Sequence, residues 1–388
     1  MNKLIKKLRA LYRLIISYLN NIFNNNLGSI IIPPTILNGS FGDELMVVSL
    51  VNHLSSSKNL LFTQYIIKRP DLFENHNNIY YQQWNTDIDW HKYSRAYLLG
   101  ADNLSGTYGN EEVLKKISLL RKSHFYHKKI EILGFSLSKN ITDVVKLALS
   151  DISSFTKFKL RDPNSYNRAL TFLPTNKVEQ VADVAFLCPL IECKDNQYKI
   201  WIEKQKKEGR KIIAICPNSI HMRNYTDGQY IQQYITLIES INKKGDYAFV
   251  LLYHDLRDLN KGWNDMKISE EIYRHIKSDN IYFTPDIING VQLKSYLPFV
   301  DITLTSRMHL GISGYSVGKP MFGITYENKF SGLQKLFNIT PEKSLVEFSS
   351  IQSAPQIFEL FIADYEKNIT NIKIALPRVM ELAKKNFI

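Results

Sequence analysis

Two ionisable residues with complementary chemistry, Arg307 and His309, stand two positions apart in the second half of the chain. They follow the strand-like run of residues 301–305, and small or apolar residues come after them, which predicts a buried strand leading into a helix. Such a junction directs backbone N–H groups and the positive end of a helix dipole at one spot. An arginine there could bind a small, multiply charged anion, and a histidine could move a proton near neutral pH. The simpler alternative is that Ser306 caps the helix and its neighbours are merely exposed.

Three further basic side chains follow apolar, strand-like runs: Arg161, His254 and Lys329. Arg161 could pair with its neighbour Asp162 instead of a ligand, and His254 could have a purely structural role, so both alternatives stay open. Taken with Arg307, these cations favour an anion-binding site.

Motifs for several other kinds of chemistry are absent from the sequence. It has no Gly-x-Ser-x-Gly nucleophile elbow, no phosphate-binding loop with its lysine, no metal-ligand cluster and no carboxylate pair placed for glycoside hydrolysis. We therefore predict a transfer reaction between two bound substrates, with no metal, no cofactor and no covalent nucleophile. The sparse cysteines, Cys188, Cys193 and Cys216, are typical of core thiols in a reducing cytoplasm.

Length and charge narrow the class of protein further. A chain of 388 residues is too long for one ordinary core, so we expect two domains. The net charge of +12 suits an anionic substrate, an anionic membrane surface or nucleic acid. Because no nucleic-acid-binding motif accompanies the charge, we expect no nucleic-acid partner.

The N-terminal segment, residues 1–23, combines basic residues with apolar residues at helical spacing. Its apolar run is much shorter than the roughly 20 residues that cross a bilayer, and no cleavage site of small residues follows it. A basic amphipathic helix lying on an anionic leaflet fits this pattern, and so does a helix that packs on the protein itself.

The rest of the chain alternates strand-like and helix-like segments. We expect strands in residues 30–32, 95–100, 129–136, 158–162, 181–186, 211–216, 247–253, 281–283, 301–305 and 321–326. Continuous apolar strands that alternate with helices predict parallel sheets covered on both faces. We therefore predict an α/β fold with two Rossmann-like domains whose parallel sheets face a cleft. The predicted parts are a basic amphipathic helix (1–27), a first domain (28–195), a second domain (205–345) and a helical tail (346–388).

The order and spacing of several motifs resemble those of the polysaccharide pyruvyl transferases over residues 30–335. The most specific motif is Ser306-Arg307-x-His309, followed by Gly318-x-Pro320 and Tyr326-x-x-Lys329. Supporting matches are Phe41-Gly42-Asp43-Glu44, Arg161-Asp162-Pro163-x-Ser165 and Ala182-Asp183-x-Ala185-Phe186. Two positions depart from the family pattern: Ser40 stands where asparagine is common, and residues 100–103 replace a glycine run.

The resemblance implies a fold like that of the two-domain GT-B glycosyltransferases. It also implies transfer of the carboxyvinyl group of phosphoenolpyruvate to two hydroxyls of a sugar, which gives a cyclic pyruvate ketal. By this resemblance Arg307 and Arg161 would hold the donor, and His309 would be the acid-base residue. We expect further substrate contacts from Lys329, Ser306, His254, Asp43 and Asn103. The first domain would bind the acceptor, a cell-surface polysaccharide or its lipid-linked precursor, and the enzyme would work in the cytoplasm, at the inner face of the membrane if residues 1–23 bind there.

Two other functions stay open. A GT-B glycosyltransferase would use a nucleotide-sugar donor, but apart from Asp286 and Glu327 we find no acidic candidate for the ribose hydroxyls. A binding protein that kept the fold and lost activity is disfavoured, because the cationic residues and His309 are all present. The lysine-rich residues 204–211 could contact an anionic acceptor, although a solvated helix explains them more simply.

Overall fold

The computed structural model describes residues 12, 15, 27–54, 58–73, 76, 78–107, 109–243, 245–259, 262–325 and 330–388. These residues form two compact units. The first unit contains residues 46–184 together with the described residues up to 37 and residues 382–388. The second contains residues 38–45 and 185–381, so each unit combines segments that are far apart in the sequence.

The first unit is built on a seven-stranded parallel sheet with the order β3-β2-β1-β4-β5-β6-β7. Its strands are β1 (Gly28–Ile32), β2 (Asn59–Thr63), β3 (Ile79–Gln83), β4 (Tyr93–Leu99), β5 (Lys129–Phe135), β6 (Thr156–Leu160) and β7 (Val178–Gln180). Its helices are α3 (Asn110–Phe125), α4 (Asp143–Asp151), α5 (Pro163–Ala169) and most of α2 (Phe41–His53). The chain leaves β1 in one direction along the sheet and returns at β4 in the other, so the strand order reverses between these two strands.

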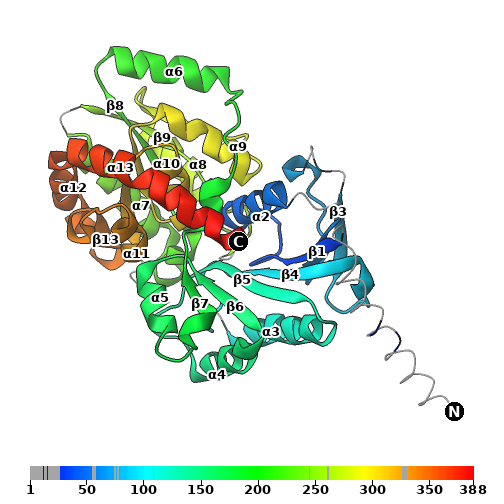
Figure 1. Ribbon diagram of the computed structural model, residues 1–388. Helices are drawn as coiled ribbons and strands as arrows, with labels where there is room; N and C mark the ends of the chain where they lie inside the picture. The colour runs from blue at the N-terminus through cyan, green and yellow to red at the C-terminus, as the bar shows by residue number, and fades with distance from the viewer. Residues whose placement is uncertain are drawn as a thin grey trace. The chain divides into compact units, whose positions relative to one another are not determined.

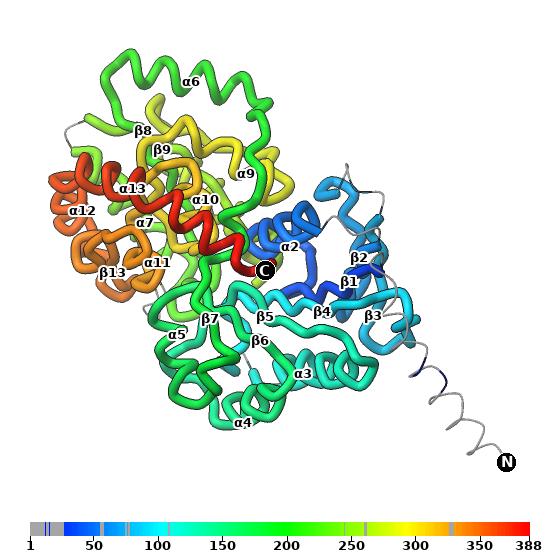
Figure 2. Tube along the Cα trace, in the orientation of Figure 1, coloured from blue at the N-terminus to red at the C-terminus, as the bar shows by residue number. Residues whose placement is uncertain are grey.

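Both faces of this sheet are buried, as the continuous apolar strands predict. Alternate residues of β1, such as Ile30 and Ile32, lie in a core cluster with the apolar side chains of α3 and α4, which cover one face (Figure 2). On the other face the fully buried Lys159 lies 3.3 Å from Glu131. Its ammonium also donates to carbonyl oxygens within residues 385–388 at 2.9 to 3.1 Å. The end of the chain therefore satisfies a buried charge of the first unit.

The second unit contains a six-stranded parallel sheet with the order β10-β9-β8-β11-β12-β13. Its strands are β8 (Lys211–Cys216), β9 (Tyr247–Leu251), β10 (Ile281–Phe283), β11 (Ile302–Thr305), β12 (Met321–Thr325) and β13 (Leu345–Glu347). Its helices are α6 (Asn196–Lys207), α7 (Asp227–Ile241), α8 (Asp265–Ile276), α9 (Gly290–Tyr296), α10 (Met308–Ser316), α11 (Ser331–Leu336), α12 (Ala354–Ala363) and most of α13 (Tyr365–Lys384).

Helices cover both faces of the second sheet as well (Figure 1). Ile213 and Ile215 of β8 pack with apolar side chains of α7, α8 and α12. The alternate residues Ile212 and Ala214 pack with α6, α9 and α10. This alternation is the period of two that a strand imposes on its side chains. The predicted fold class, two Rossmann-like α/β domains with parallel sheets, is confirmed.

Two glycines of α10 let this helix approach the sheet closely. A Cβ atom at Gly311 would lie 2.0 Å from the sulfur of Met321, and one at Gly314 would lie 2.9 Å from the side chain of Thr303. The glycine-rich sequence after His309 therefore serves the packing of the helix on β11 and β12.

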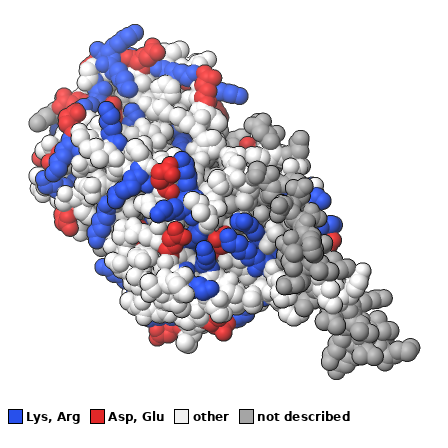
Figure 3. Space-filling view, in the orientation of Figure 1, with Lys and Arg blue, Asp and Glu red and all other residues white. Residues whose placement is uncertain are grey.

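Other expectations had different outcomes. The predicted strand over residues 181–186 is wrong, because β7 ends at Gln180 and residues 184–187 form a 3₁₀ turn. The predicted N-terminal helix lies outside the described residues, apart from Tyr12 and Ile15. On the face drawn in Figure 3, lysine and arginine side chains are spread over α6 and α13 and are interspersed with acidic ones.

Candidate active site

The candidate site lies at the carboxyl ends of β8, β9 and β11 in the second unit. The order of that sheet reverses between β8 and β11, and ligands of open α/β sheets bind at such a switch point. Ser219 follows β8, His254 follows β9 and Arg307 follows β11. The three connections bring ionisable residues together that are far apart in the sequence.

Arg307 is held in a fixed position by two carboxylates. Its backbone is extended, and its N–H group donates to the hydroxyl of Thr305 at 2.8 Å. The guanidinium donates two hydrogen bonds to Asp265, from Nε at 2.7 Å and from Nη2 at 2.6 Å. Asp255 lies 3.5 Å from Nη1. A planar, bidentate pair of this kind fixes the orientation of an arginine as well as its charge.

Asp265 begins α8 and is fully buried. Besides Arg307, the backbone N–H of Ser219 donates to its carboxylate at 2.9 Å. Burial raises the pKa of Asp265 above its ordinary value, and the guanidinium of Arg307 opposes that rise. The carboxylate is thus stabilised by its donors, and it is the main partner that orients Arg307.

A second ion pair continues this network. Arg257 donates to both oxygens of the buried Asp255, from Nε at 2.9 Å and from Nη2 at 2.7 Å. The charges alternate in the order Arg257, Asp255, Arg307, Asp265, and they balance one another. Arg257 and Asp265 were not among the residues predicted from the sequence. The local pattern Asp255-x-Arg257 was a signal for the first, whereas Asp265 looks like any acidic residue at the start of a helix.

His254 and His309 stack with nearly parallel rings, 6.3 Å between centroids and 9° between planes. His254 is only 4% exposed, and its Nε2 is buried with no hydrogen-bond partner among the described residues. Burial lowers the pKa of His254 well below its ordinary value, and interactions with His309, Arg307 and Arg257 act in the same direction. His254 is therefore neutral, while the neighbouring His309 is only partly buried.

The beginning of α2 forms one wall of this site. Residues 38–45 belong to the second unit, and the backbone N–H of Phe41 donates to the carbonyl oxygen of His254 at 3.1 Å. Gly42 lies directly against His309, since a Cβ atom at position 42 would be 2.2 Å from its Nδ1. The carboxylate of Glu44 accepts a hydrogen bond from the backbone of Gly290 at 3.1 Å, which holds this segment in place. Asp43, a predicted substrate contact, is buried in the same turn and interacts electrostatically with Arg257.

Ser306 connects the site to neighbouring segments of the second unit by hydrogen bonds. Its hydroxyl shares a hydrogen bond with Tyr234 at 2.8 Å, and its carbonyl oxygen accepts from the side chain of Asn218 at 3.2 Å. Arg307, not Ser306, is the residue that precedes the first turn of α10, and it makes no side-chain cap. A role of Ser306 in substrate binding stays a prediction.

Two predicted site residues belong to the first unit, and a third is outside the described residues. Arg161 is in the first unit, where its guanidinium pairs with Asp183 at 2.6 Å and also interacts electrostatically with its neighbour Asp162. Asn103 is also in the first unit, and its amide donates to the carbonyl oxygen of Pro34 at 3.3 Å. Lys329 lies outside the described residues.

Among the described residues, no group of three or more His, Cys, Asp or Glu side chains is placed to hold a metal ion. No helix in this part of the chain has the length and hydrophobicity of a membrane span.

The two units define the chain as a two-domain α/β protein with the fold of the GT-B glycosyltransferases, as solved structures confirm. A glycosyltransferase from Rickettsia africae superposes with a TM-score of 0.53 at 11% identity, covering 93% of this chain and 99% of the other. The Anabaena protein HepE, in complex with UDP and glucose, superposes with a TM-score of 0.55 at 11% identity, covering 93% and 95%. At these identities the likeness concerns the fold alone.

The sequence gives the finer assignment. A model of the polysaccharide pyruvyl transferase family matches residues 41–328, and the chain therefore belongs to this family of transferases. The resemblance stated from the motifs is confirmed. A search of the curated proteins found no significant match.

Proposed function

We propose that the protein transfers the pyruvyl group of phosphoenolpyruvate to two hydroxyls of a sugar in a polysaccharide or its lipid-linked precursor, forming a pyruvate ketal. The observation that carries the proposal is the arrangement of Arg307 and His309 at the switch point of the second sheet. Arg307 is oriented there by Asp265, and His309 lies two residues further on, between Gly42 and His254. The family match supports this reaction.

The charge balance of the site sets a requirement for donor binding. Arg257 and Arg307 are balanced by Asp255 and Asp265, whereas phosphoenolpyruvate carries about three negative charges. Binding it therefore needs additional positive charge. Lys329 remains our predicted source, and a proton on His309 would add to it. Arg161, whose charge Asp183 balances, remains a predicted donor contact but not a source of net charge.

The reaction can be written with one acid-base residue. A proton moves from His309 to the methylene carbon of the donor, which becomes a methyl group, and positive charge develops on the adjacent carbon. A sugar hydroxyl attacks that carbon and its proton returns to His309. A second hydroxyl then displaces phosphate, which leaves with the proton of that hydroxyl as hydrogen phosphate. The arginines stabilise the negative charge of the leaving group.

The packing of His309 suggests which of its nitrogens takes part. Its Nδ1 edge lies against Gly42, and the ring of the neutral His254 lies nearly parallel to it with 6.3 Å between centroids. We therefore assign the proton transfer to Nε2. His254 cannot compete for the proton, because burial keeps its pKa low.

The proposal is tested with the donor first. Phosphoenolpyruvate should raise the melting temperature of the full chain, and UDP-glucose should not. His309→Ala should abolish phosphate release in the presence of acceptor and keep most of the donor-induced stabilisation, while Arg307→Ala should lose both. Stabilisation by the nucleotide sugar alone would reverse the choice in favour of a glycosyltransferase, the alternative raised by the fold.

The location is a separate part of the proposal. A lipid-linked acceptor would be presented at the cytoplasmic face of the membrane, and the basic residues of segment 1–23 would bind the anionic leaflet there. Deleting residues 1–23 should then release the protein from vesicles that contain anionic lipid. Unchanged binding to these vesicles would contradict the assignment.

A further inference from the structure

The loop that follows β2 exposes three large apolar side chains in a row. Tyr65 is 56% exposed, Ile66 46% and Ile67 36%. In the described part of the chain no other run of consecutive exposed large apolar residues is as long, since most such residues are scattered singly. Scattered apolar side chains are normal on a protein surface, whereas a contiguous group marks a place where the protein meets a partner.

Both ends of this loop are held by hydrogen bonds. At the first end, the hydroxyl of Thr63 donates to the carbonyl oxygen of Tyr65 at 2.7 Å. At the second end, the backbone N–H of Arg69 donates to the hydroxyl of Tyr81 at 3.3 Å. The guanidinium of Arg69 also donates two hydrogen bonds to Asp71, at 2.9 and 2.7 Å. The exposure of the apolar side chains between these ends is therefore a property of the folded first unit.

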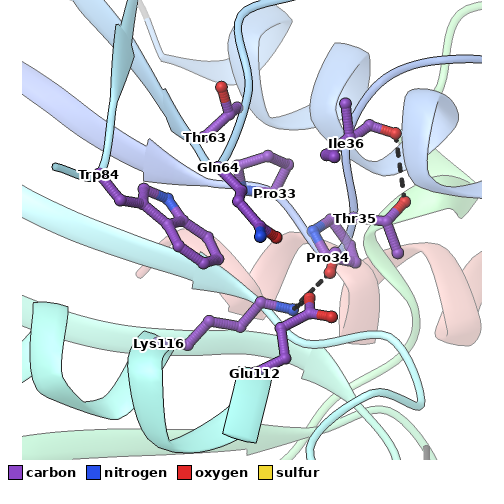
Figure 4. A pocket seen from close by; sticks show the side chains of 9 residues that line it. All are labelled: Pro33, Pro34, Thr35, Ile36, Thr63, Gln64, Trp84, Glu112 and Lys116. Carbon is purple, nitrogen blue, oxygen red and sulfur yellow. Dashed lines mark hydrogen bonds and ion pairs between the residues drawn. The ribbon is translucent and has the colours of Figure 1, made fainter.

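The loop lies at the carboxyl edge of the first sheet. Figure 4 shows its base, where Thr63 and Gln64 at the end of β2 border a small hollow with the segment after β1 (residues 33–36), Trp84 and two side chains of α3. Ligands of open α/β sheets bind at the carboxyl ends of the strands. A partner that meets the loop is therefore next to the edge of the sheet at which substrates are expected.

The charges around the loop leave one cation unbalanced. Three carboxylates of this region have a basic partner at 2.7 Å: Asp71 with Arg69, Glu111 with Lys115, and Glu112 with Lys116. Lys68, which directly follows the apolar residues, is exposed and has no carboxylate partner among the described residues. The whole chain carries a net charge of +12. An anionic surface is the partner that these charges favour.

A bilayer surface fits this loop better than another protein does. A stable contact between proteins buries on the order of 1,000 Å² against a complementary surface, which the tip of one loop cannot provide. A bilayer is fluid and needs no matching shape. Isoleucine side chains can enter the acyl boundary, tyrosine is typical of the membrane interface, and lysine is attracted by anionic headgroups.

We propose that residues 65–68 insert into the surface of an anionic bilayer, with Tyr65, Ile66 and Ile67 at the acyl boundary and Lys68 among the headgroups. This contact belongs to the folded first unit and is separate from the one predicted for residues 1–23. Its role rests on the proposed function: it brings the carboxyl edge of the first sheet to the leaflet that holds a lipid-linked acceptor.

The test places an environment-sensitive fluorophore on the loop of the full chain. The native cysteines, Cys188, Cys193 and Cys216, are all buried, so a thiol reagent should label Ile66→Cys selectively. On vesicles of phosphatidylglycerol and phosphatidylcholine in equal parts, emission of this label should shift to the blue as it leaves water. The matched control is Leu147→Cys, at a position of α4 that is 71% exposed, whose label should emit as it does in water. A label at position 66 that stays in water while the protein is bound to the vesicles would overturn the inference.

Substitutions measure how much the loop contributes to vesicle binding. The triple variant Tyr65→Ser, Ile66→Ser and Ile67→Ser should bind these vesicles about 30-fold more weakly, because it removes the apolar surface that enters the bilayer. Lys68→Glu should weaken binding about tenfold at low salt, and this effect should fall as salt is added. All four positions are exposed, so the substitutions should leave the fold intact.

The matched control for the triple variant is Leu147→Ser, which should bind the vesicles as the unaltered chain does. Equal vesicle binding by the triple variant and this control would refute the inference. A changed oligomeric state of the triple variant in the absence of vesicles would assign the loop to a protein contact and refute it as well.

A parallel measurement distinguishes this inference from the proposed function. Phosphoenolpyruvate should stabilise the triple variant as it does the unaltered chain, since the donor site is assigned to the second unit. A blue shift of the label at position 66 without any effect of phosphoenolpyruvate on the unaltered chain would refute the donor assignment and leave the membrane contact standing.

Discussion

The substitution His254→Gln should remove a specific pH dependence of stability. In the folded protein the imidazole is buried among His309 of α10, Arg307 after β11, Arg257 of the following loop and the ring of Phe41, which lies 6.0 Å away between centroids. These surroundings lower its pKa well below the ordinary value of 6.5. The unfolded chain can therefore take up a proton at this residue that the folded chain cannot.

The sign and size of the effect follow from this difference. Stability contributed by the neutral imidazole is fully present above about pH 6.5 and is lost as the pH falls below that value, because protonation then favours the unfolded state. For a group that stays neutral in the folded state, the loss approaches about 1.4 kcal/mol per pH unit. Between about pH 7.5 and 5.5 the single proton should cost about 1.4 kcal/mol in total.

The measurement is the free energy of unfolding in urea for the unaltered chain and for His254→Gln at these two pH values. Taking the difference between the two proteins cancels the pH dependence of all other groups that the substitution leaves alone. A difference near zero for His254→Gln would mean that the imidazole titrates normally in the folded protein and would refute the assignment of His254 as a neutral partner.

Two further substitutions test how the site is held together. Asp265→Asn leaves Arg307 without its main carboxylate partner, so it should lower the free energy of unfolding by about 3 kcal/mol. The same variant should lose the stabilisation by phosphoenolpyruvate. Unchanged donor binding would show that Arg307 does not need the orientation that Asp265 gives it. Gly42→Ala should push the imidazole of His309 aside and lower the rate of phosphate release about 100-fold, whereas Gly228→Ala, where the added carbon meets no atom within 4 Å, should have normal activity. Equal rates for the two alanine variants would show that Gly42 is not needed for the position of His309.

The sequence predicted those elements that a short stretch of residues identifies by itself, such as a continuous apolar run. Apolar runs such as residues 129–136 and 247–253 marked buried parallel strands, and the small, apolar residues after His309 marked the helix that follows β11. β3 was missed because its sequence, Ile-Tyr-Tyr-Gln-Gln, is half polar and it lies at the edge of its sheet, where one side needs no apolar cover. The false strand over residues 181–186 is apolar because it is buried, although its backbone is not extended throughout.

The residues of the candidate site also fall into those that the sequence predicted and those that it did not. Arg307, His309 and His254 could be found because each follows a strand in the sequence. Asp265 could not, since only the fold places the first residue of α8 beside the end of β11. The sequence does not show which basic residue a buried carboxylate such as Asp265 will pair with. That pairing joins distant segments, so it is decided by the tertiary structure.

The exchange of segments between the units has a consequence for how the chain is made. The first unit depends on residues 382–388, whose carbonyl oxygens surround the ammonium of Lys159, yet these residues leave the ribosome only after the entire second unit. At typical rates of synthesis this delay is on the order of ten seconds or more. During that interval Lys159 has Glu131 as a partner but lacks the carbonyl oxygens of residues 385–388, so the first unit is completed only after residues 382–388 have been made.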